Sequence, residues 1–397
     1  MMGKQIVRPY YARLRDRLLV VNPLIQVLTG PRQVGKTTLV KQILNDEALS
    51  GIYITADQIS GGHEAWLETN WEMALLAAKT ENRPYCLVVD EVQKIPQWSE
   101  LIKRIWDGRN PDAKGINLLL LGSSRLLLQQ GLSESLMGRF ETLYLGHWDF
   151  DEAKRAFGVD LDHYIYQGLY PGGAHLHSDP DRWLAFLQDS IVETSISKDV
   201  LQLTRIDKPA LLRNLFDIGC SYSSRELSYT KILGQLDGAG NTTTLAHYLK
   251  LLGSAGLLSG LEKFEKTSIR RRASTPKFQV HNNALLLASG FKTFEQVRSD
   301  HTLWGKFTES AVGAHLLNKS RELRFHLHYW RDGLNEVDYV ISRGDCIVGF
   351  EVKSGSLNKL AGLEKFKQKF PGAKTYIVGS RGIPVETFLR TSPVDFL

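Results

Sequence analysis

Residues 30–37 constrain the fold of this chain more than any other segment, because they match the phosphate-binding loop pattern G-x-x-x-x-G-K-[ST]. The apolar stretch 24–29 predicts a short buried strand before the loop, and residues 38–44 predict a helix after it. In this setting glycines let the backbone approach phosphates, and N–H groups at the helix start bind anions. We expect Lys36 to reach the β- and γ-phosphates of a nucleotide and the hydroxyl of Thr37 to bind Mg²⁺. The predicted nucleotide-binding residues are Gly30, Pro31, Arg32, Gln33, Val34, Gly35, Lys36, Thr37 and Thr38.

A second motif, residues 85–91, reads Tyr-Cys-Leu-Val-Val-Asp-Glu and predicts a buried strand that ends in two acids. Such a strand end after a phosphate loop is typical of a hydrolytic nucleotide site. We expect Asp90 to hold the Mg²⁺ shell and Glu91 to orient or deprotonate the water that attacks the γ-phosphate. Together the two motifs predict ATP hydrolysis with ATP and Mg²⁺ as the bound groups.

Two further candidates for the catalytic set follow, Ser124 and Arg139. Residues 116–124 predict a buried strand, and in a parallel sheet ligands bind at the carboxyl ends of strands, so Ser123 or Ser124 would contact the γ-phosphate or the water. A plain turn is the equal alternative. Arg139 precedes the predicted strand 141–145, where an arginine finger would reach a neighbouring subunit's nucleotide. That role requires a homo-oligomer, and the alternative is a surface arginine or one that pairs within the fold.

Length, cysteines and charge limit the class of protein. A chain of 397 residues predicts two or three domains. Cys86, Cys220 and Cys346 are far apart, which argues against a disulfide frame or a zinc site and favours a reducing cytoplasm. The first five residues lack the apolar run of a secretory signal, and no apolar stretch of about 18 residues predicts a membrane span. We therefore expect a cytoplasmic protein, whose net charge of +6 permits nucleic-acid binding without showing it.

The motifs resemble those of a family of bacterial and archaeal AAA+ ATPases that carry a C-terminal restriction-endonuclease-like domain of the PD-(D/E)XK type. The resemblance rests on residues 30–39, Asp90-Glu91-Val92-Gln93, Gly122-Ser123-Ser124, Gly138-Arg139, Gly168-Leu169-Tyr170-Pro171-Gly172-Gly173, Tyr329-Trp330-Arg331, Glu336-Val337-Asp338 and Glu351-Val352-Lys353. It covers nearly the whole chain. Two features depart from AAA+ proteins at large: serine stands where the polar sensor is usually asparagine, and no second sensor arginine is evident.

The resemblance implies an α/β fold in which a parallel P-loop sheet is followed by a helical lid, a winged-helix region and a nuclease-like α/β domain. The expected boundaries are 1–150 for the ATPase core, 151–220 for the lid, 221–285 for the winged helix and 286–397 for the nuclease-like domain. At the start of the core, the near-helical spacing of apolar residues predicts an amphipathic helix that covers it. These residues are Tyr11, Leu14, Leu18 and Leu19.

In the predicted winged helix, residues 242–255 read as the second helix, with Leu245, Leu249 and Leu252 on its core face. Its outward side is polar and a basic wing follows, which is a DNA-reading geometry. The outward residues are Thr243, Thr244, His247 and Lys250, and the basic residues of the wing are Lys263, Lys266, Arg270, Arg271 and Arg272. The alternative is a winged helix that packs internally or binds a protein.

The C-terminal region predicts a hairpin with strands 337–341 and 346–352 around a Gly344-Asp345 turn. This register pairs Asp338 with Glu351 and places Lys353 on the same face. Two acids that face each other across a sheet are unfavourable unless a positive charge lies between them.

Mg²⁺ and Lys353 would supply that charge, and the result would be a metal-dependent phosphodiester nuclease in which carboxylates hold the metal. Glu309, on the predicted helix 304–317, is a further acid, and the resemblance points to the same four residues: Glu309, Asp338, Glu351 and Lys353. The alternative is a retained fold without cleavage, in which Lys353 pairs with the acids.

Two functions are therefore expected from the sequence. In the first, nucleotide state controls engagement of nucleic acid, with or without cleavage. In the second, the chain is a nucleotide-dependent switch that binds a protein partner through an inactive nuclease-like docking domain.

Overall fold

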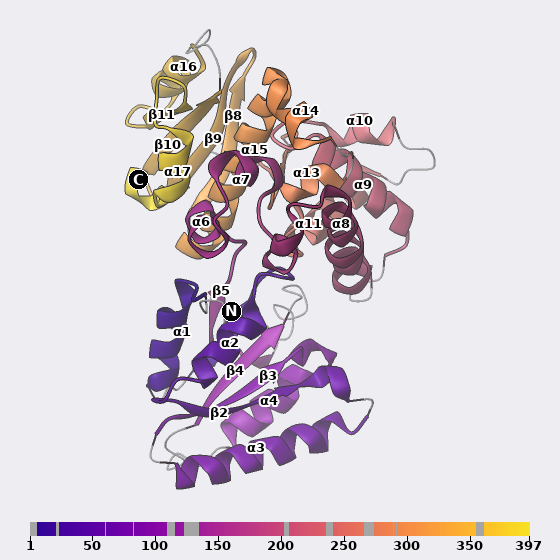
Figure 1. Ribbon diagram of the computed structural model, residues 1–397, viewed down its shortest axis with the longest axis vertical. Coiled ribbons are helices and arrows are strands. Elements are labelled where there is room, and N and C mark those ends of the chain that lie inside the picture. The colour runs from indigo at the N-terminus through magenta and orange to yellow at the C-terminus, as the bar shows by residue number, and fades with distance from the viewer. Residues whose placement is uncertain are drawn as a thin grey trace. The chain divides into compact units, whose positions relative to one another are not determined.

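The computed structural model describes residues 6–20, 24–59, 61–81, 83–108, 116–122, 135–201, 206–235, 241–265, 274–288, 290, 292–354 and 361–397. The chain divides into two compact units, Met1–Leu145 and Gly146–Leu397 (Figure 1). The finer boundaries expected at residues 220 and 285 remain predictions.

The first unit is built on a five-stranded sheet in the order β2–β3–β4–β1–β5, with all neighbouring strands parallel. The strands are β1 (Ile25–Thr29), β2 (Ser50–Thr55), β3 (Tyr85–Asp90), β4 (Ile116–Gly122) and β5 (Phe140–Tyr144). The phosphate loop follows β1 and Glu91 follows β3, so both motifs lie at the carboxyl edge of the sheet. This confirms the parallel α/β sheet that the sequence predicts.

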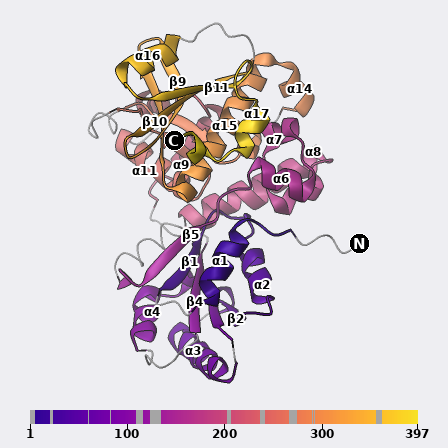
Figure 2. The ribbon, with the colours of Figure 1, turned by 90° about the vertical axis from the view of Figure 1, so that its left-hand side faces the viewer.

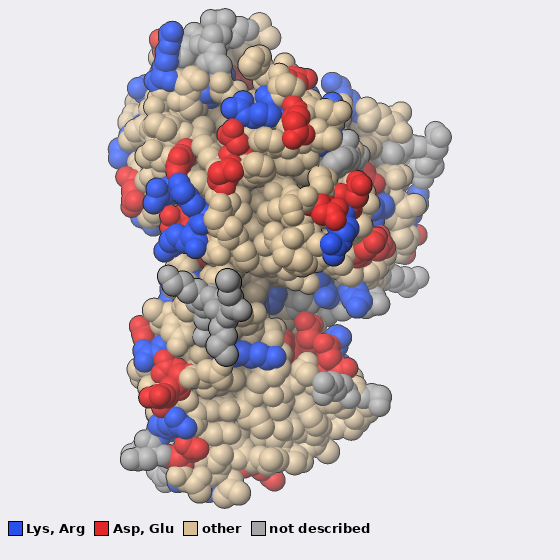
Figure 3. Space-filling view, in the orientation of Figure 1, with Lys and Arg blue, Asp and Glu red and all other residues tan. Residues whose placement is uncertain are grey.

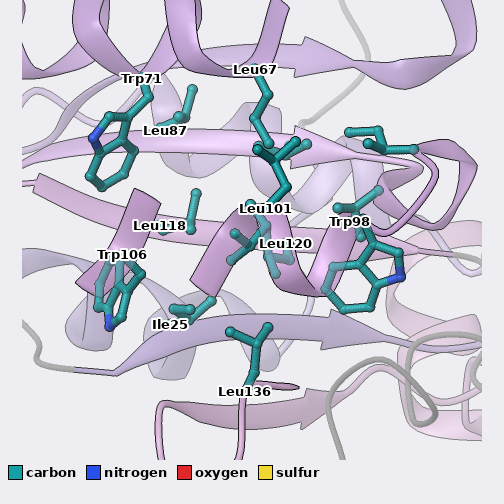
Figure 4. Close-up of a cluster of buried hydrophobic side chains, with 14 of the residues drawn as sticks. Ile25, Leu67, Trp71, Leu87, Trp98, Leu101, Trp106, Leu118, Leu120 and Leu136 are labelled. Carbon is teal, nitrogen blue, oxygen red and sulfur yellow. The ribbon is translucent and has the colours of Figure 1, made fainter. Parts of the chain in front are cut away.

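Helices cover both faces of this sheet (Figure 2). They are α1 (Tyr10–Leu19), α2 (Lys36–Leu44), α3 (His63–Thr80) and α4 (Trp98–Asp107), with the short turns η1 (Ala56–Gln58) and η2 (Val92–Lys94). Successive strand residues face opposite sides, so Cys86 belongs to the cluster with α1 and α2, and Leu87 to the cluster with α3 and α4. Figure 4 shows the latter cluster, where aliphatic strand residues meet Trp71, Trp98 and Trp106.

Helix α1 confirms the amphipathic helix predicted at the start of the core. Leu14 and Leu18 are buried in the same cluster as Val34 of the phosphate loop and Val40 of α2. The side-chain amide of Asn117, inside β4, donates to the carbonyl oxygen of Leu18 at 2.8 Å. The helix therefore covers the same face of the sheet as α2 and packs against the phosphate loop.

The second unit begins with a run of helical segments, in agreement with the mostly helical content expected for residues 151–220. They are α6 (Phe150–Phe157), α7 (Leu161–Gln167), η3 (Pro171–Leu176), α8 (Pro180–Ala185), η4 (Phe186–Glu193), η5 (Ser195–Leu201) and α9 (Pro209–Ser221). Phe150 of α6 is buried in the same cluster as Tyr339 and Phe350, which belong to the sheet near the C-terminus described below. Asn283 Nδ2 donates to the carbonyl of Ile165, in α7, at 2.6 Å. Helices α6 and α7 thus pack inside the second unit, and their assignment to a lid remains a prediction.

Two helices and a hairpin follow where the sequence predicts helix, helix and wing. They are α10 (Tyr229–Leu233), α11 (Thr242–Ser254) and the antiparallel pair β6 (Leu258–Leu261) and β7 (Lys277–Val280). Gly256 has a φ of 76° just after α11, a left-handed conformation that commonly ends helices at glycine. Strand β7 contacts both α9 and α15 (His301–Leu323), which ties this region to the C-terminal sheet.

The C-terminal sheet has the order β11–β10–β9–β8. The helices α13 (Ala284–Ala288) and α14 (Phe294–Ser299) precede α15. The strands of the sheet and the helices after them are β8 (His326–Asp332), β9 (Asn335–Arg343), β10 (Cys346–Lys353), α16 (Ala361–Lys369), β11 (Lys374–Gly379), α17 (Val385–Arg390) and η6 (Pro393–Phe396). Strands β8, β9 and β10 are antiparallel, and β11 runs parallel to β10. Leu316 of α15 packs on one face and Phe366 of α16 on the other.

The β9–β10 hairpin has the predicted turn and register. Only Gly344 and Asp345 separate the two strands, and Gly344 has a φ of 58°. The paired residues run from Arg343–Cys346 to Tyr339–Phe350. One further step along this register brings Asp338 beside Glu351.

Candidate functional site

Two glycines shape the loop between β1 and α2. A Cβ atom on Gly30 would lie 2.1 Å from the carbonyl oxygen of Leu145, so no larger residue fits there without a shift of the backbone. Gly35 has a φ of 93°, in the left-handed region that glycine adopts without strain, and it precedes the first residue of α2. The first N–H groups of a helix have no partner within the helix, and its dipole is positive at this end. The loop therefore leads into a helix start that suits an anion.

Lys36 folds back over the loop backbone. Its Nζ donates to the carbonyl oxygens of Gly30 at 2.8 Å and Pro31 at 2.7 Å. Phosphate oxygens would replace these carbonyls as acceptors when a nucleotide binds. Arg8 supports the loop from its other side, where its buried Nη1 donates to the carbonyl of Val34 at 3.0 Å.

Thr37, Asp90 and Tyr53 meet at the carboxyl edge of the sheet. Thr37 Oγ1 donates to Asp90 Oδ2 at 3.2 Å, and the Tyr53 hydroxyl donates to the same oxygen. The other oxygen, Oδ1, accepts from the Glu91 N–H at 2.8 Å. Hydroxyl and carboxylate oxygens are the hard ligands that Mg²⁺ prefers. The residues present therefore fit a magnesium ion held by Thr37 and Asp90.

Sequence reasoning did not identify the role of the Tyr53 side chain. Tyr53 lies opposite Val88 in the β2–β3 pairing, and its ring reaches two residues further to Asp90. Burial, and then the bond to Asp90, raise the pKa of Tyr53 well above its usual value, so the hydroxyl keeps its proton and donates. The contact depends on which strand pairs with β3, and no local pattern encodes that.

Glu91 leaves β3 in a left-handed conformation, with a φ of 53°. The side-chain amide of Gln93 donates to its Oε2. Burial, followed by the charge of Asp90, raises the pKa of Glu91, while Arg32 and Lys36 act in the opposite direction. A carboxylate with a raised pKa is a stronger base, which suits the activation of water.

Arg139 lies at the opposite edge of the sheet from the phosphate loop. Its backbone carbonyl accepts from the N–H of Ile25, the first residue of β1. Its guanidinium makes two bonds to Asp107, at 2.7 and 2.9 Å. Within its own chain Arg139 therefore pairs with a neighbour, and its role as a finger for a second subunit's nucleotide remains a prediction.

Several predicted residues lie outside the part of the chain that the structure describes. They are Ser123, Ser124, Lys266, Arg270, Arg271 and Arg272. Lys263 is described, and its Nζ lies 3.1 Å from Glu265 Oε1. On α11, Thr243, His247 and Lys250 are exposed, as the sequence predicts. On the face shown in Figure 3, acidic and basic side chains are interspersed over both units.

The predicted nuclease residues come together in the second unit. Glu309 lies on α15, Asp338 on β9, and Glu351 and Lys353 on β10. Lys353 Nζ lies 2.6 Å from Glu351 Oε1, which is the pairing expected of a fold retained without cleavage. Asp338 Oδ2 accepts from the N–H of Val352 at 2.8 Å. Burial, and then the neighbouring Asp338, raise the pKa values of both Glu309 and Glu351.

A residue that sequence reasoning missed, Lys277 of β7, reaches into this acidic cluster. Its Nζ lies 2.7 Å from Glu309 Oε1 and 3.6 Å from Asp338 Oδ1, and it donates to the carbonyl of Asp338 at 3.1 Å. The sequence around it, Lys277-Phe278-Gln279-Val280, alternates polar and apolar residues and gives no sign of this contact. Lys277 is separated from the acids by 32 positions or more, so only the folded chain reveals the contact.

The described residues contain no group of three or more His, Cys, Asp or Glu side chains that could hold a metal ion. They also contain no helix that is both long enough and apolar enough to cross a membrane. The predicted metal ligands Asp338 and Glu351 lie close together, but they are not part of such a metal-binding group among the described residues.

Three family models match successive parts of the chain. Residues 22–154 match a model described as AAA domain, residues 158–295 a domain of unknown function numbered 8612, and residues 304–387 a domain of unknown function numbered 4143. The last match contains Glu309, Asp338, Glu351 and Lys353, whereas Lys277 falls within the second.

The chain is also similar to proteins with curated sequences. Uncharacterized proteins of Mycobacterium tuberculosis and Mycobacterium bovis are each 25% identical over 408 residues, with 97% of this chain and 85% of the relative covered. An uncharacterized protein of Methanocaldococcus jannaschii is 32% identical over 118 residues, with 29% of this chain and 24% of the relative covered.

Two solved structures share 15% sequence identity with the chain. The Walker-type ATPase PABY2304 of Pyrococcus abyssi has a TM-score of 0.49 and covers 72% of this chain and 95% of its own. The Orc1 protein of Aeropyrum pernix in complex with DNA has a TM-score of 0.31, with 72% and 93% covered. At these TM-scores they add nothing to the sheet order described above. The sheet, the phosphate loop and the family match together show that residues 22–154 form an AAA-type ATPase domain.

Proposed function

We propose that this protein hydrolyses ATP in its first unit and uses the nucleotide state to control engagement of nucleic acid by its second unit. The observation that carries the first half is the meeting of Lys36, Thr37, Asp90 and Glu91 at one edge of the sheet. Lys36 and Thr37 come from the start of α2, and Asp90 and Glu91 from the end of β3, so the convergence of two separate elements supports a built site.

In this site the loop N–H groups and Lys36 bind the β- and γ-phosphates. Thr37 and Asp90 hold the magnesium ion, which when bound neutralises phosphate charge. Tyr53 keeps the Asp90 carboxylate aimed at that position through its hydrogen bond. Glu91 accepts a proton from the attacking water, after its Oε2 is released by Gln93.

Engagement of nucleic acid is proposed for the region 221–285. The support is the exposed polar side of α11, followed by the β6–β7 hairpin, which is the arrangement of a recognition helix beside a wing. Lys263 contributes less than the sequence suggests, because Glu265 neutralises its charge.

The test is steady-state ATP turnover by the full chain with and without duplex and single-stranded DNA, at low and moderate salt. The proposal predicts stimulation by DNA that fades as salt rises, because phosphate contacts release counterions. The variant Lys250→Ala should weaken the stimulation, whereas Lys79→Ala, a change to an exposed lysine of the first unit, should not. An ATP turnover rate that DNA does not change at any salt concentration would contradict coupling between the nucleotide site and nucleic acid.

A second candidate function is a nucleotide-dependent switch that binds a protein partner. The contact of Lys277 with Glu309 and Asp338 favours it, because a domain with an internal ammonium among its acids is poorly suited to metal-dependent cleavage. Under this alternative the C-terminal sheet is a docking module. DNA-independent turnover together with no detectable DNA affinity would support it over the first candidate.

A further inference from the structure

The acidic cluster of the second unit contains its own positive charges. Three carboxyl groups, those of Glu309, Asp338 and Glu351, lie near the ammonium groups of Lys277 and Lys353. Lys353 is two residues from Glu351 in sequence, and its pairing with the acids was the alternative that the sequence left open. Lys277 arrives from a separate hairpin and contacts the two remaining acids.

Lys277 is buried, with 6% of its surface exposed. A buried ammonium group is unfavourable unless charged partners and hydrogen bonds compensate it. Burial alone would lower the pKa of Lys277, but Glu309 and Asp338 outweigh that effect and raise it, so the side chain stays charged. The ammonium also lies 4.7 Å from the centre of the Tyr339 ring, which adds a cation–π contact.

The strand that carries Lys277 is fixed in place by its neighbours. Gln279, two residues along β7, donates through Nε2 to the carbonyl of Ser310 on α15 at 2.9 Å. The Tyr339 hydroxyl lies 2.9 Å from Gln279 Oε1. A Cβ on Gly313 of α15 would lie 2.1 Å from that same oxygen. A glycine at this position therefore leaves room for the Gln279 side chain of β7 beside the helix. The position of Lys277 is therefore built into the packing of β7 against α15 and β9.

The residues present do not fit a divalent metal in this arrangement. Asp338 Oδ2 is engaged by the Val352 N–H and Glu351 Oε1 by Lys353, while Lys277 contacts Glu309 Oε1 and lies near Asp338 Oδ1. Glu351 Oε2 is buried and has no hydrogen-bond partner among the described residues. Mg²⁺ requires close to six oxygen ligands, and a neighbouring ammonium group repels it.

We propose that Lys277 is the resident cation of this cluster and that its ammonium group excludes divalent metal ions from the acids Glu309 and Asp338. Strand β7 thus keeps the C-terminal domain in a state that cannot perform metal-dependent cleavage. A cavity of about 340 Å³ borders the cluster, so the acids are reachable from one side. Metal binds these acids only when the Lys277 ammonium group is absent. The inference concerns the second unit alone and does not depend on ATP hydrolysis by the first.

The test is the number of Mn²⁺ ions bound per full-length chain without nucleotide, counted by electron paramagnetic resonance. Wild type and Asp338→Asn should bind the same number, because the wild-type cluster holds no metal. Lys277→Met keeps the length of the side chain and removes its charge, so this variant should bind one additional ion. The double variant Lys277→Met/Asp338→Asn should lose that ion again.

The matched control is Lys263→Met, which changes a lysine of the same region that pairs with Glu265 instead of the cluster. It should bind the same number of ions as wild type. Loss of a bound ion on going from wild type to Asp338→Asn would overturn the proposal, and this comparison remains decisive if Lys277→Met does not fold. A folded Lys277→Met variant that binds no additional ion would overturn it equally.

Discussion

Lys277 Nζ lies 2.7 Å from Glu309 Oε1, and this pair joins strand β7 to helix α15 across the interior of the second unit. Lys277 is almost fully buried, whereas Glu309 retains 24% side-chain exposure. The pair is therefore a packing contact between two elements as well as an electrostatic one. Its two partners fall within different family matches, 158–295 and 304–387, so the contact connects these two regions of the second unit.

Breaking this pair from one side should destabilise the second unit. Removal of one partner from a buried ion pair typically costs about 3–5 kcal/mol, because the other charge is left uncompensated. We expect Glu309→Leu and Lys277→Met each to lower the free energy of unfolding, with Asp338 limiting the loss in Glu309→Leu. The double variant should recover part of the loss. Chemical unfolding followed by a probe in the second unit measures this, and strictly additive effects would contradict a direct coupling.

Tyr53→Phe should impair turnover by weakening the magnesium site. The substitution removes the hydroxyl that donates to Asp90 Oδ2 and keeps the ring. We expect turnover to fall about 10-fold and the Mg²⁺ concentration at half-maximal rate to rise, since one hydrogen bond to a charged group contributes about 1.5–3 kcal/mol. The control is Tyr85→Phe, at the amino end of the adjacent strand β3. A Tyr53→Phe enzyme with an unchanged Mg²⁺ requirement would show that Tyr53 only packs.

Arg139 should act, if it is a finger, on the nucleotide of a second subunit. We expect Arg139→Ala to lower turnover by about 10³-fold, the lower end of the range for arginine fingers. Mixing Arg139→Ala with Glu91→Gln should restore part of the activity, because each variant supplies what the other lacks.

The control for the arginine is Asp107→Asn, which removes the charge and one of the two acceptors that hold the Arg139 guanidinium and should leave turnover intact. Equal loss of activity in Asp107→Asn and Arg139→Ala, with none restored by mixing, would show that Arg139 stabilises its own subunit through Asp107. A protein that stays monomeric with every nucleotide would lead to the same conclusion.

His315 should make the second unit less stable in mild acid. Burial lowers the pKa of this histidine to about 4, below the ordinary value of 6.5. Between these two pH values the unfolded chain binds more protons than the folded one, so stability falls as the pH is lowered through this range. The full effect is about 3 kcal/mol by the usual conversion of a pKa difference. His315→Leu should flatten the pH profile of unfolding, whereas the exposed His301→Leu should not; equal profiles for all three proteins would refute the assignment.

The sequence predicted the parts of this molecule that local patterns encode. The phosphate loop, the strand that ends at Asp90 and the two-residue turn at Gly344 and Asp345 all depend on residues that are neighbours in the chain. The hairpin register followed from that turn alone, because turn length sets which residues face each other. Glycines at fixed positions and short apolar runs were sufficient signals for these features.

The contacts that the sequence did not predict join residues from distant elements. Tyr53 meets Asp90 because β2 pairs with β3, and Arg8 meets Val34 because α1 packs beside the phosphate loop. Lys277 meets Glu309 through the packing of a hairpin that was expected to serve as a wing. Contacts between residues so far apart in the sequence produce no periodic pattern along the chain, so only the folded structure shows them.

ATP turnover by the Glu91→Gln variant decides whether Glu91 is the base of the hydrolytic site. Glutamine keeps the shape of the side chain and cannot take a proton from water. The account predicts turnover reduced by about 10²-fold or more, with binding of a fluorescent ATP analogue unchanged, because Lys36, Thr37 and the loop remain intact. A Glu91→Gln protein that hydrolyses ATP at the wild-type rate would contradict the assignment of the catalytic site.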